Sequence, residues 1–294
     1  MRILAFSDVI KREGYEELLG KFQPDIITLP GDLTSDGFAS FWNEAIEQIP
    51  KFQKEKNQLM EKFGVIQISK NFYRCTKDQS PQEWFNILES LRDKYQNTKE
   101  FLKIRKRIHV DRFYRFLKCA GRKSKVLIVK GDHDDDFERD YIPERIDRII
   151  GCKEISDKII EMQGLHFLGL GFNETHYLKK LRPIIEKFKE KVDVVISHCE
   201  QDKLPLVSLL KPKIIIRGHF GSGKYLVNSI PSVFTMGVKY TIIELKDEKI
   251  LKISQYIIGS DNKLRILEKG SCRPFFSKFS EFERYKWLKP FPEE

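Results

Sequence analysis

The sequence has 294 residues, a formal net charge of +10 and a hydrophobic content of 40%. This length suits one large α/β domain or two average ones, and the apolar content is enough for a sizeable core. No run approaches the ~20 apolar residues of a membrane span, and the first strand follows Met1 without the apolar core of a signal peptide, so we expect a cytoplasmic protein.

The cysteines and the charged residues add two expectations. The five cysteines are odd in number and include no CxxC pair, which argues against a disulfide framework and against a zinc knuckle. Charged residues make up 33% of the chain and many of them are Lys and Glu, a composition typical of thermophilic proteins.

The first part of the chain predicts a compact βαβ unit followed by a helical insertion. The elements expected here are a strand at 2–8, a helix at 14–22, a strand at 25–32, and helices at 40–60, 81–96 and 98–120. About ninety residues therefore separate the second strand from the next core strand, whereas a parallel crossover needs a dozen or so residues including its helix. We expect 39–123 to be an insertion that stands off the sheet as a cap.

The second part predicts further strands and helices that complete the core. Its expected elements are a strand from Lys125, a hairpin of 158–163 and 165–172 turning at Gly164, a helix at 177–191, a strand at 192–198, a helix at 204–210, and strands at 214–219, 225–230 and 240–258. The core is thus expected to comprise 1–38 and 124–269. The tail, 270–294, is rich in aromatic residues, and we expect it to pack on the fold.

Five apolar runs end in a residue suited to metal binding or acid–base chemistry. These endings are Asp8, Asp32, the pair Asp132 and His133, His198 and His219. Ligands of open α/β sheets collect beyond the carboxyl ends of parallel strands, so we expect these side chains to meet at one edge. A single polar ending is usually just the first loop residue, but five with only Asp and His predict a site.

The five endings resemble, in order and setting, the signature blocks of the calcineurin-like metallophosphoesterases. The blocks are Asp8, Gly31-Asp32, Gly131-Asp132-His133-Asp134, His198 and Gly218-His219. The resemblance covers about 1–38 and 124–258. It implies an α/β fold of the αββα sandwich type, with a two-metal site at the strand tips. It also implies hydrolysis of a phosphomonoester or phosphodiester by a metal-bound hydroxide.

The sequence departs from the family pattern at two ligand positions. The family has a metal-binding His where this chain has Ile10, and another where it has Gly221. The resemblance therefore leaves Asp8 and the bridging Asp32 for the first metal. It leaves Asp32, His198 and His219 for the second, with Asp132 where the family has Asn. This set implies one tightly bound divalent ion (Mn, Fe, Zn, Ni or Mg) and a second site that is weak or absent.

The remaining site predictions concern acid catalysis and substrate contact. The resemblance places His133 as the general acid, with Asp134 orienting it. Gly218 to Tyr225 fits the spacing of a phosphate loop but lacks the Ser or Thr that such a loop needs, so it predicts no nucleotide site. Lys224 in that stretch is instead a candidate phosphate contact.

The insertion is strongly basic, because residues 51–130 carry 21 Lys and Arg against 8 Asp and Glu. Arg105, Lys106 and Arg107 lie in its densest part and are candidate contacts to substrate or nucleic acid. A solvated helix face is an equally plain interpretation. The alternative to an enzyme is a catalytically degenerate member of the same fold, acting as a binding or assembly module. Both hypotheses involve a phosphate-ester or nucleic-acid partner and no membrane.

Overall fold

The structure is a computed structural model of the chain. It describes residues 1–7, 15–33, 45–69, 72–75, 81–96, 98–132, 134, 141–172, 178–198, 201–219, 222–235, 239–247, 249–258, 264–266 and 288–290. The chain divides into two compact units, one formed by 1–35 with 113–294 and the other by 36–112. No helix among the described residues is both long and apolar enough to cross a membrane.

The first unit contains two seven-stranded mixed sheets. The first sheet has the order β15 (Leu264–Ile266), β14 (Lys249–Ile258), β13 (Lys239–Lys246), β1 (Arg2–Ala5), β2 (Ile26–Pro30), β5 (Lys125–Val129) and β6 (Cys152–Glu154). The second has the order β16 (Leu288–Pro290), β11 (Ser222–Val227), β12 (Ile230–Thr235), β10 (Ile214–Arg217), β9 (Val194–Ser197), β8 (Leu165–Leu170) and β7 (Ile159–Met162). In each sheet four adjacent strands are parallel, β1-β2-β5-β6 in the first and β12-β10-β9-β8 in the second.

The two sheets pack face to face around one apolar core. Alternate residues of the central strands point into this core, because successive side chains of a strand face opposite sides. The core residues include Ile3, Ala5, Leu127, Val129, Val194, Ile196, Ile214 and Ile216. The residues between them, such as Leu4, Ile128 and Val195, are buried on the outer faces, so the central strands bury apolar side chains on both faces.

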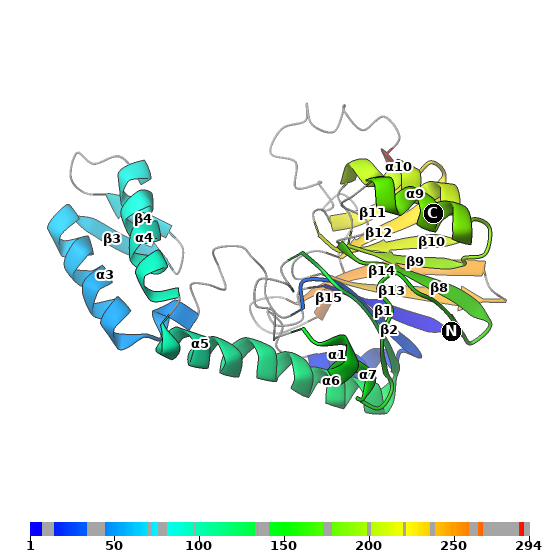
Figure 1. The fold of residues 1–294 in the computed structure, drawn as a ribbon, viewed down its shortest axis with the longest axis horizontal. Helices are drawn as coiled ribbons and strands as arrows, with labels where there is room; N and C mark the ends of the chain where they lie inside the picture. Colours follow the sequence, from blue (N-terminus) through cyan, green and yellow to red (C-terminus); the bar gives the residue numbers. More distant parts are fainter. Residues whose placement is uncertain are drawn as a thin grey trace. The chain divides into compact units, whose positions relative to one another are not determined.

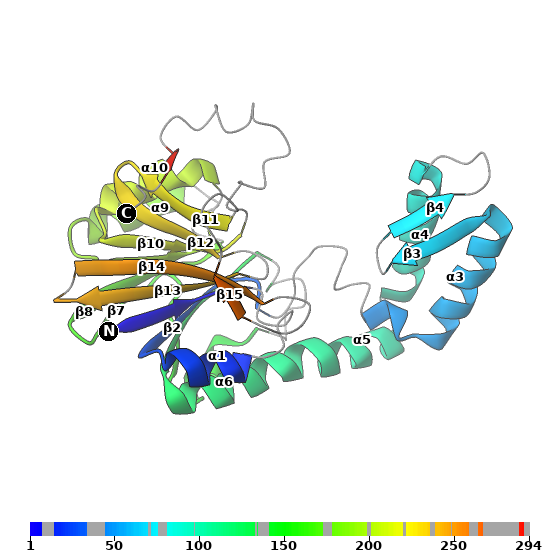
Figure 2. The ribbon, with the colours of Figure 1, turned by 180° about the vertical axis from the view of Figure 1, so that it is seen from behind.

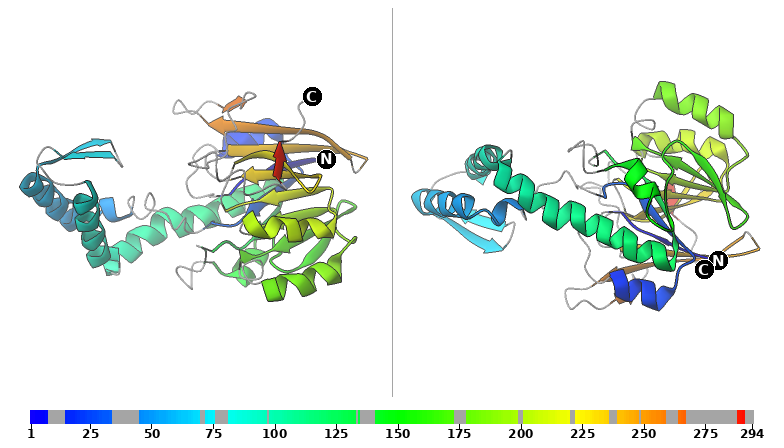
Figure 3. Two further views of the ribbon diagram at one scale, coloured as in Figure 1. Left: turned by 90° about the horizontal axis from the view of Figure 1, so that it is seen from above. Right: turned by 60° about the horizontal axis from the view of Figure 1, so that its bottom comes forward.

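Helices cover the outer face of each sheet (Figures 1 and 2). On the first sheet these are α1 (Tyr15–Phe22), α6 (Asp111–Lys123) and α7 (Pro143–Asp147), and on the second they are α9 (Leu178–Phe188) and α10 (Leu204–Val207). Short 3-10 segments, η4 (Gln201–Lys203) and η5 (Ser208–Leu210), flank α10. The views of Figure 3 show the same layers. The first unit therefore confirms the predicted α/β class.

Packing explains why α6 belongs to the first unit although the sequence assigned it to the insertion. Its inward side buries aromatic and small residues, among them Phe113, Phe116 and Ala120. The Phe116 ring lies 5.7 Å from that of Phe6, which follows β1. The boundary between the two units falls after Arg112, eleven residues before the end of the predicted insertion at 123.

The second unit contains helices and a small hairpin. Its elements are α3 (Pro50–Phe63), β3 (Val65–Ser69), β4 (Phe72–Cys75), α4 (Pro81–Gln96), α5 (Lys99–Arg105) and the π-helical segment η2 (Lys106–Val110). Helix α3 is capped at its C-terminus by Gly64, whose φ of 62° is in the left-handed region that glycine adopts readily. The β3–β4 hairpin was not predicted.

The tail is described only in part. Leu288–Pro290 pair with β11 and form the edge strand of the second sheet. The prediction that 270–294 packs on the fold otherwise concerns residues outside the described ranges.

Candidate metal centre

Four predicted residues lie together at the carboxyl ends of four parallel strands. Asp32 follows β2 and Asp132 follows β5, which are neighbours in the first sheet. His198 follows β9 and His219 follows β10, which are neighbours in the second sheet. One donor atom from each residue lies within 4.8 Å of the others. Because the sheets pack face to face, strand ends far apart in sequence form one site.

The donor atoms are separated by distances that suit a common cation. His198 Nε2 lies 2.8 Å from Asp132 Oδ1 and 3.4 Å from Asp32 Oδ1. His219 Nδ1 lies 3.2 Å from His198 Nε2 and 3.3 Å from Asp132 Oδ1. Ligands placed about 2.1 Å from one ion are themselves about 3.0–3.4 Å apart in octahedral or tetrahedral geometry. The cluster therefore has the dimensions of a metal coordination shell.

The tautomer of His198 follows from its other ring nitrogen. Nδ1 lies 2.7 Å from the carbonyl oxygen of Pro30, and a carbonyl oxygen only accepts hydrogen bonds. Nδ1 therefore carries the proton, and in the neutral ring Nε2 presents its lone pair to the cluster. A backbone carbonyl that orients a histidine in this way is typical of metal sites.

The convergence of lone pairs calls for positive charge. The two carboxylates and the two imidazole nitrogens face one another, and His198 is completely buried. A single proton can be shared by only two of these donor atoms, whereas a divalent cation can bind all four and balances the two carboxylate charges. The donor set therefore fits a divalent metal ion, and two imidazoles among the ligands suit Mn, Fe or Zn better than Mg.

Burial keeps His219 available as a neutral ligand. Its burial lowers the pKa of the imidazole, the nearby Asp132 raises it, and the charges of His198 and Arg217 lower it further. The net pKa is below the ordinary value, so the ring is neutral near pH 7. The Phe172 ring lies 5.8 Å from the His219 ring and 6.2 Å from that of His198, and it adds apolar surface beside both histidines.

Two ligands sit in strained backbone conformations. The φ angles of Asp32 and His219 are 55° and 65°, in the left-handed region that residues with a Cβ seldom adopt. Such conformations cost on the order of 1–3 kcal/mol each and persist where surrounding contacts fix them. The turn at each strand end thus directs its side chain toward the other sheet.

Glycines beside the ligands let the two sheets come together. A Cβ on Gly31 would lie 2.1 Å from His198 Nδ1, and a Cβ on Gly218 would lie 1.8 Å from the Pro30 carbonyl oxygen. Both positions flank the hydrogen bond between His198 and Pro30. Only glycine fits there, which gives the Gly-Asp and Gly-His pairs of the sequence a steric reason.

Asp134 holds the two aspartate turns in place. Its buried carboxylate accepts the backbone N–H of Leu33 at 2.7 Å and that of Gly131 at 2.8 Å. Leu33 follows Asp32 and Gly131 precedes Asp132, so one side chain ties both metal-ligand turns together. The sequence suggested Asp134 only as a partner of His133, since backbone contacts of this kind leave no pattern in a sequence.

Several other predicted site residues fall on parts of the chain that the structure does not describe. Asp8 and His133 lie outside the described residues, as do Ile10 and Gly221. Lys224 is on β11, but its side chain is outside the described part of the structure.

The three basic candidates belong to the second unit and differ from one another in environment. Arg105, a candidate contact to substrate or nucleic acid, is buried, with 5% of its surface exposed. Arg107 donates to Gln48 at 2.8 Å, and Lys106 is exposed.

Comparison with solved structures supports the fold. One crystal structure aligns with 91% of this chain and 98% of its own, at 14% identity and a TM-score of 0.50. The TT1561 protein of Thermus thermophilus aligns over 86% of this chain and 97% of its own, at 11% identity and a TM-score of 0.43. No family model matches the chain. No curated protein matches it either.

Proposed function

We propose that this protein is a metal-dependent phosphoesterase of the calcineurin-like metallophosphoesterase type, acting on a phosphomonoester or phosphodiester. The observation that carries the proposal is the convergence of Asp32, Asp132, His198 and His219 from two sheets, with all donor atoms within 4.8 Å of one another and four of their separations at 2.8–3.4 Å. The face-to-face sheets with helices outside are the arrangement that the resemblance implies. The signature blocks in sequence support the same assignment.

The residues of the chain have distinct parts in such a site. Asp32 and Asp132 supply negative charge, while His198 Nε2 and His219 Nδ1 supply neutral donors. This set would hold a divalent ion, which would supply Lewis-acid polarisation of a phosphoryl oxygen and a lower pKa for a water bound to it. Asp134 keeps the two aspartate turns in register. His133, one residue from both Asp132 and Asp134, remains the candidate acid for the leaving group.

Metal analysis of the purified protein and phosphatase assays test the proposal. Activity is measured on bis-p-nitrophenyl phosphate and p-nitrophenyl phosphate with Mn, Ni, Co, Mg and Zn. His219→Ala should abolish both metal content and turnover, whereas His133→Ala should keep the metal and lower turnover by about 100-fold. His166→Ala is a matched control, because this half-exposed histidine pairs with Asp193 at the opposite end of β9 from His198.

A second function is favoured by the missing ligands. Ile10 and Gly221 offer no donor atoms where the resembling family has histidines. A chain that keeps one half of the site is then a binding or assembly module. Wild-type protein that binds metal but hydrolyses neither substrate with any of the five ions would favour this alternative.

A further inference from the structure

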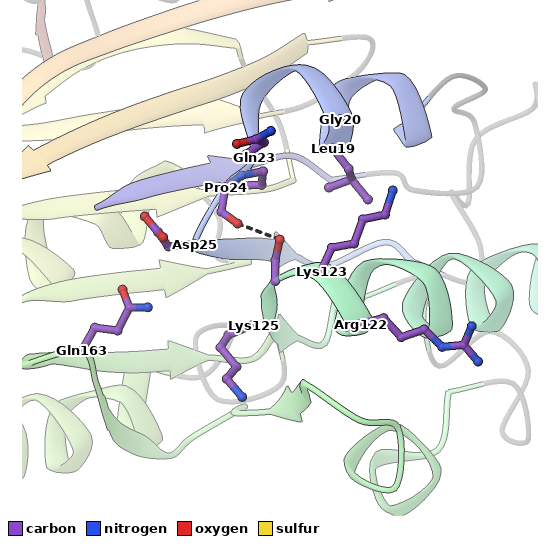
Figure 4. A pocket seen from close by; sticks show the side chains of 11 residues that line it. Leu19, Gly20, Gln23, Pro24, Asp25, Arg122, Lys123, Lys125 and Gln163 are labelled. Carbon is purple, nitrogen blue, oxygen red and sulfur yellow. Dashed lines mark hydrogen bonds between the residues drawn. The ribbon is translucent and has the colours of Figure 1, made fainter.

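A basic hollow lies at the opposite end of the strands from the metal cluster. It is a cavity of about 740 Å³, and Figure 4 shows its lining. Its cationic residues are Arg122 and Lys123, which end α6, and Lys125, which begins β5. Residue 132 is seven positions further along the same strand and turn, which corresponds to about 23 Å of extended chain at roughly 3.3 Å per residue.

Four exposed cations of this region form no ion pair within the part of the chain that the structure describes. From Arg112 to Lys130 the sequence has seven Lys and Arg residues and no Asp or Glu. Lys118, Arg122, Lys123 and Lys125 are exposed, and none forms an ion pair with any residue that the structure describes. Elsewhere in the same unit surface lysines do find partners, such as Lys153 with Asp147 at 3.2 Å and Lys211 with Glu190 at 2.7 Å.

The one acidic residue that lines the hollow is already engaged. Asp25 accepts the backbone N–H of Arg2 at 2.7 Å. This hydrogen bond links the start of β1 to the residue before β2, so the carboxylate is engaged with the backbone. The walls are also fixed to each other, because Ser124 donates its hydroxyl to Pro24 O at 2.7 Å, the dashed line in Figure 4. The cations therefore project from a preorganised surface.

Stabilisation of α6 does not account for all of these charges. Cations in the last turn of a helix offset the negative end of its dipole, which explains Arg122 and Lys123. Lys118 lies more than one turn before the helix end, and Lys125 lies on the following strand. The basic surface thus extends beyond what the helix requires.

We propose that the basic hollow and the adjoining exposed face of α6 bind the phosphate backbone of a nucleic acid. In Figure 4 Lys123 extends toward Leu19 of α1, whereas Arg122 and Lys125 point in other directions. Divergent cations contact successive phosphates of a chain, not one small anion. A concave surface of this size also fits a strand better than a flat bilayer. The proposal does not depend on hydrolysis at the metal cluster.

Fluorescence anisotropy with a labelled single-stranded DNA of about 30 nucleotides tests this site. EDTA is present so that turnover cannot remove the probe, and NaCl is varied from about 50 to 300 mM. The variant Arg122→Gln, Lys123→Gln, Lys125→Gln is compared with Lys179→Gln, Arg182→Gln, Lys189→Gln, three exposed cations on and just after α9. Thermal melts check that both variants fold, and glutamine avoids placing negative charge at the helix end.

Loss of three phosphate contacts should lower the magnitude of the slope of log K against log salt by about 2–3, since each contact contributes about 0.7–0.9. Affinity at the lowest salt should fall by roughly tenfold or more, while the α9 control should bind like the wild type. No binding by the wild type, or equal loss in both variants, overturns the proposal. Displacement of the DNA by inorganic phosphate at equal charge concentration also overturns it, because that identifies a small-anion site.

Discussion

The Asp134→Asn substitution examines how the metal ligands are positioned. The carboxylate of Asp134 accepts two buried backbone N–H groups, from Leu33 and Gly131, at 2.7 and 2.8 Å. Asparagine keeps the shape but replaces one acceptor oxygen with an NH₂ donor, which then faces a backbone donor. One hydrogen bond to a charged group is lost and one buried N–H is left unsatisfied.

The expected cost follows from these two bonds. A hydrogen bond to a charged group contributes about 1.5–3 kcal/mol, and an unsatisfied buried donor costs about 1–3 kcal/mol. Together they lower the expected free energy of unfolding by about 2.5–6 kcal/mol. Because the two amides belong to the turns of Asp32 and Asp132, metal affinity should also fall by about 10–100-fold, as for other groups that orient ligands.

Urea denaturation in EDTA measures the stability term, and titration calorimetry with Mn²⁺ or Zn²⁺ measures the affinity term. Asp193→Asn is the matched control. Asp193 also accepts a backbone N–H, from His166 at 2.8 Å, but at the far end of β9 from His198. It should lose stability and keep metal affinity. Unchanged metal affinity in Asp134→Asn would refute the positioning role, and unchanged stability would refute the hydrogen-bond reasoning.

Two further predictions concern a glycine and a buried histidine. Gly31→Ala should destabilise the fold and abolish tight metal binding, since its Cβ would lie 2.1 Å from His198 Nδ1. Gly164 has a similar positive φ but lies in open space, so Gly164→Ala is the control. It should lower the free energy of unfolding by only about 1–2 kcal/mol and leave metal binding, measured by calorimetry, intact. Burial lowers the pKa of His109 to about 3, and the charges of Arg105 and Arg112 add to this effect. Between pH 6.5 and about 3, the imidazole is therefore protonated in the unfolded chain and neutral in the folded chain. The unfolding free energy should therefore fall by about 1.4 kcal/mol for each pH unit below pH 6.5. Urea titrations of His109→Phe should show a weaker dependence of this free energy on pH. An equal dependence in the variant and the wild type would count against the assignment.

The sequence predicted the four residues of the cluster because strand ends leave a readable pattern. Asp32, Asp132, His198 and His219 each close an apolar run, and parallel strands place such endings at one edge. The sequence carried no signal for the Pro30 carbonyl that orients His198, because every residue has a carbonyl group. Contacts made through the backbone therefore had to come from the structure.

Short and edge elements were harder to predict than central strands. β6 has three residues, too few for any periodicity, and β12 contains Pro231, which suggested a turn. Pro231 is tolerated as the second residue of its strand, near the strand end. In contrast the β7–β8 hairpin was predicted at Gly164, where Gln163 and Gly164 both have positive φ.

The predicted end of the insertion and the boundary between the two units differ for a related reason. The run of helix from Lys99 to Lys123 is continuous in sequence pattern, and only tertiary packing shows that the part after Arg112 belongs with the sheets. Amphipathicity indicates that α6 buries one side, but not which unit receives it.

Metal titration of the apo protein tests the central claim most directly. Calorimetry with Mn²⁺ or Zn²⁺ should show one tightly bound ion per chain in the wild type, no tight binding in His198→Ala or His219→Ala, and unchanged binding in His166→Ala. These outcomes follow if Asp32, Asp132, His198 and His219 are the ligand set. Tight binding that survives in both His198→Ala and His219→Ala, or a wild type that binds no ion, would contradict the account.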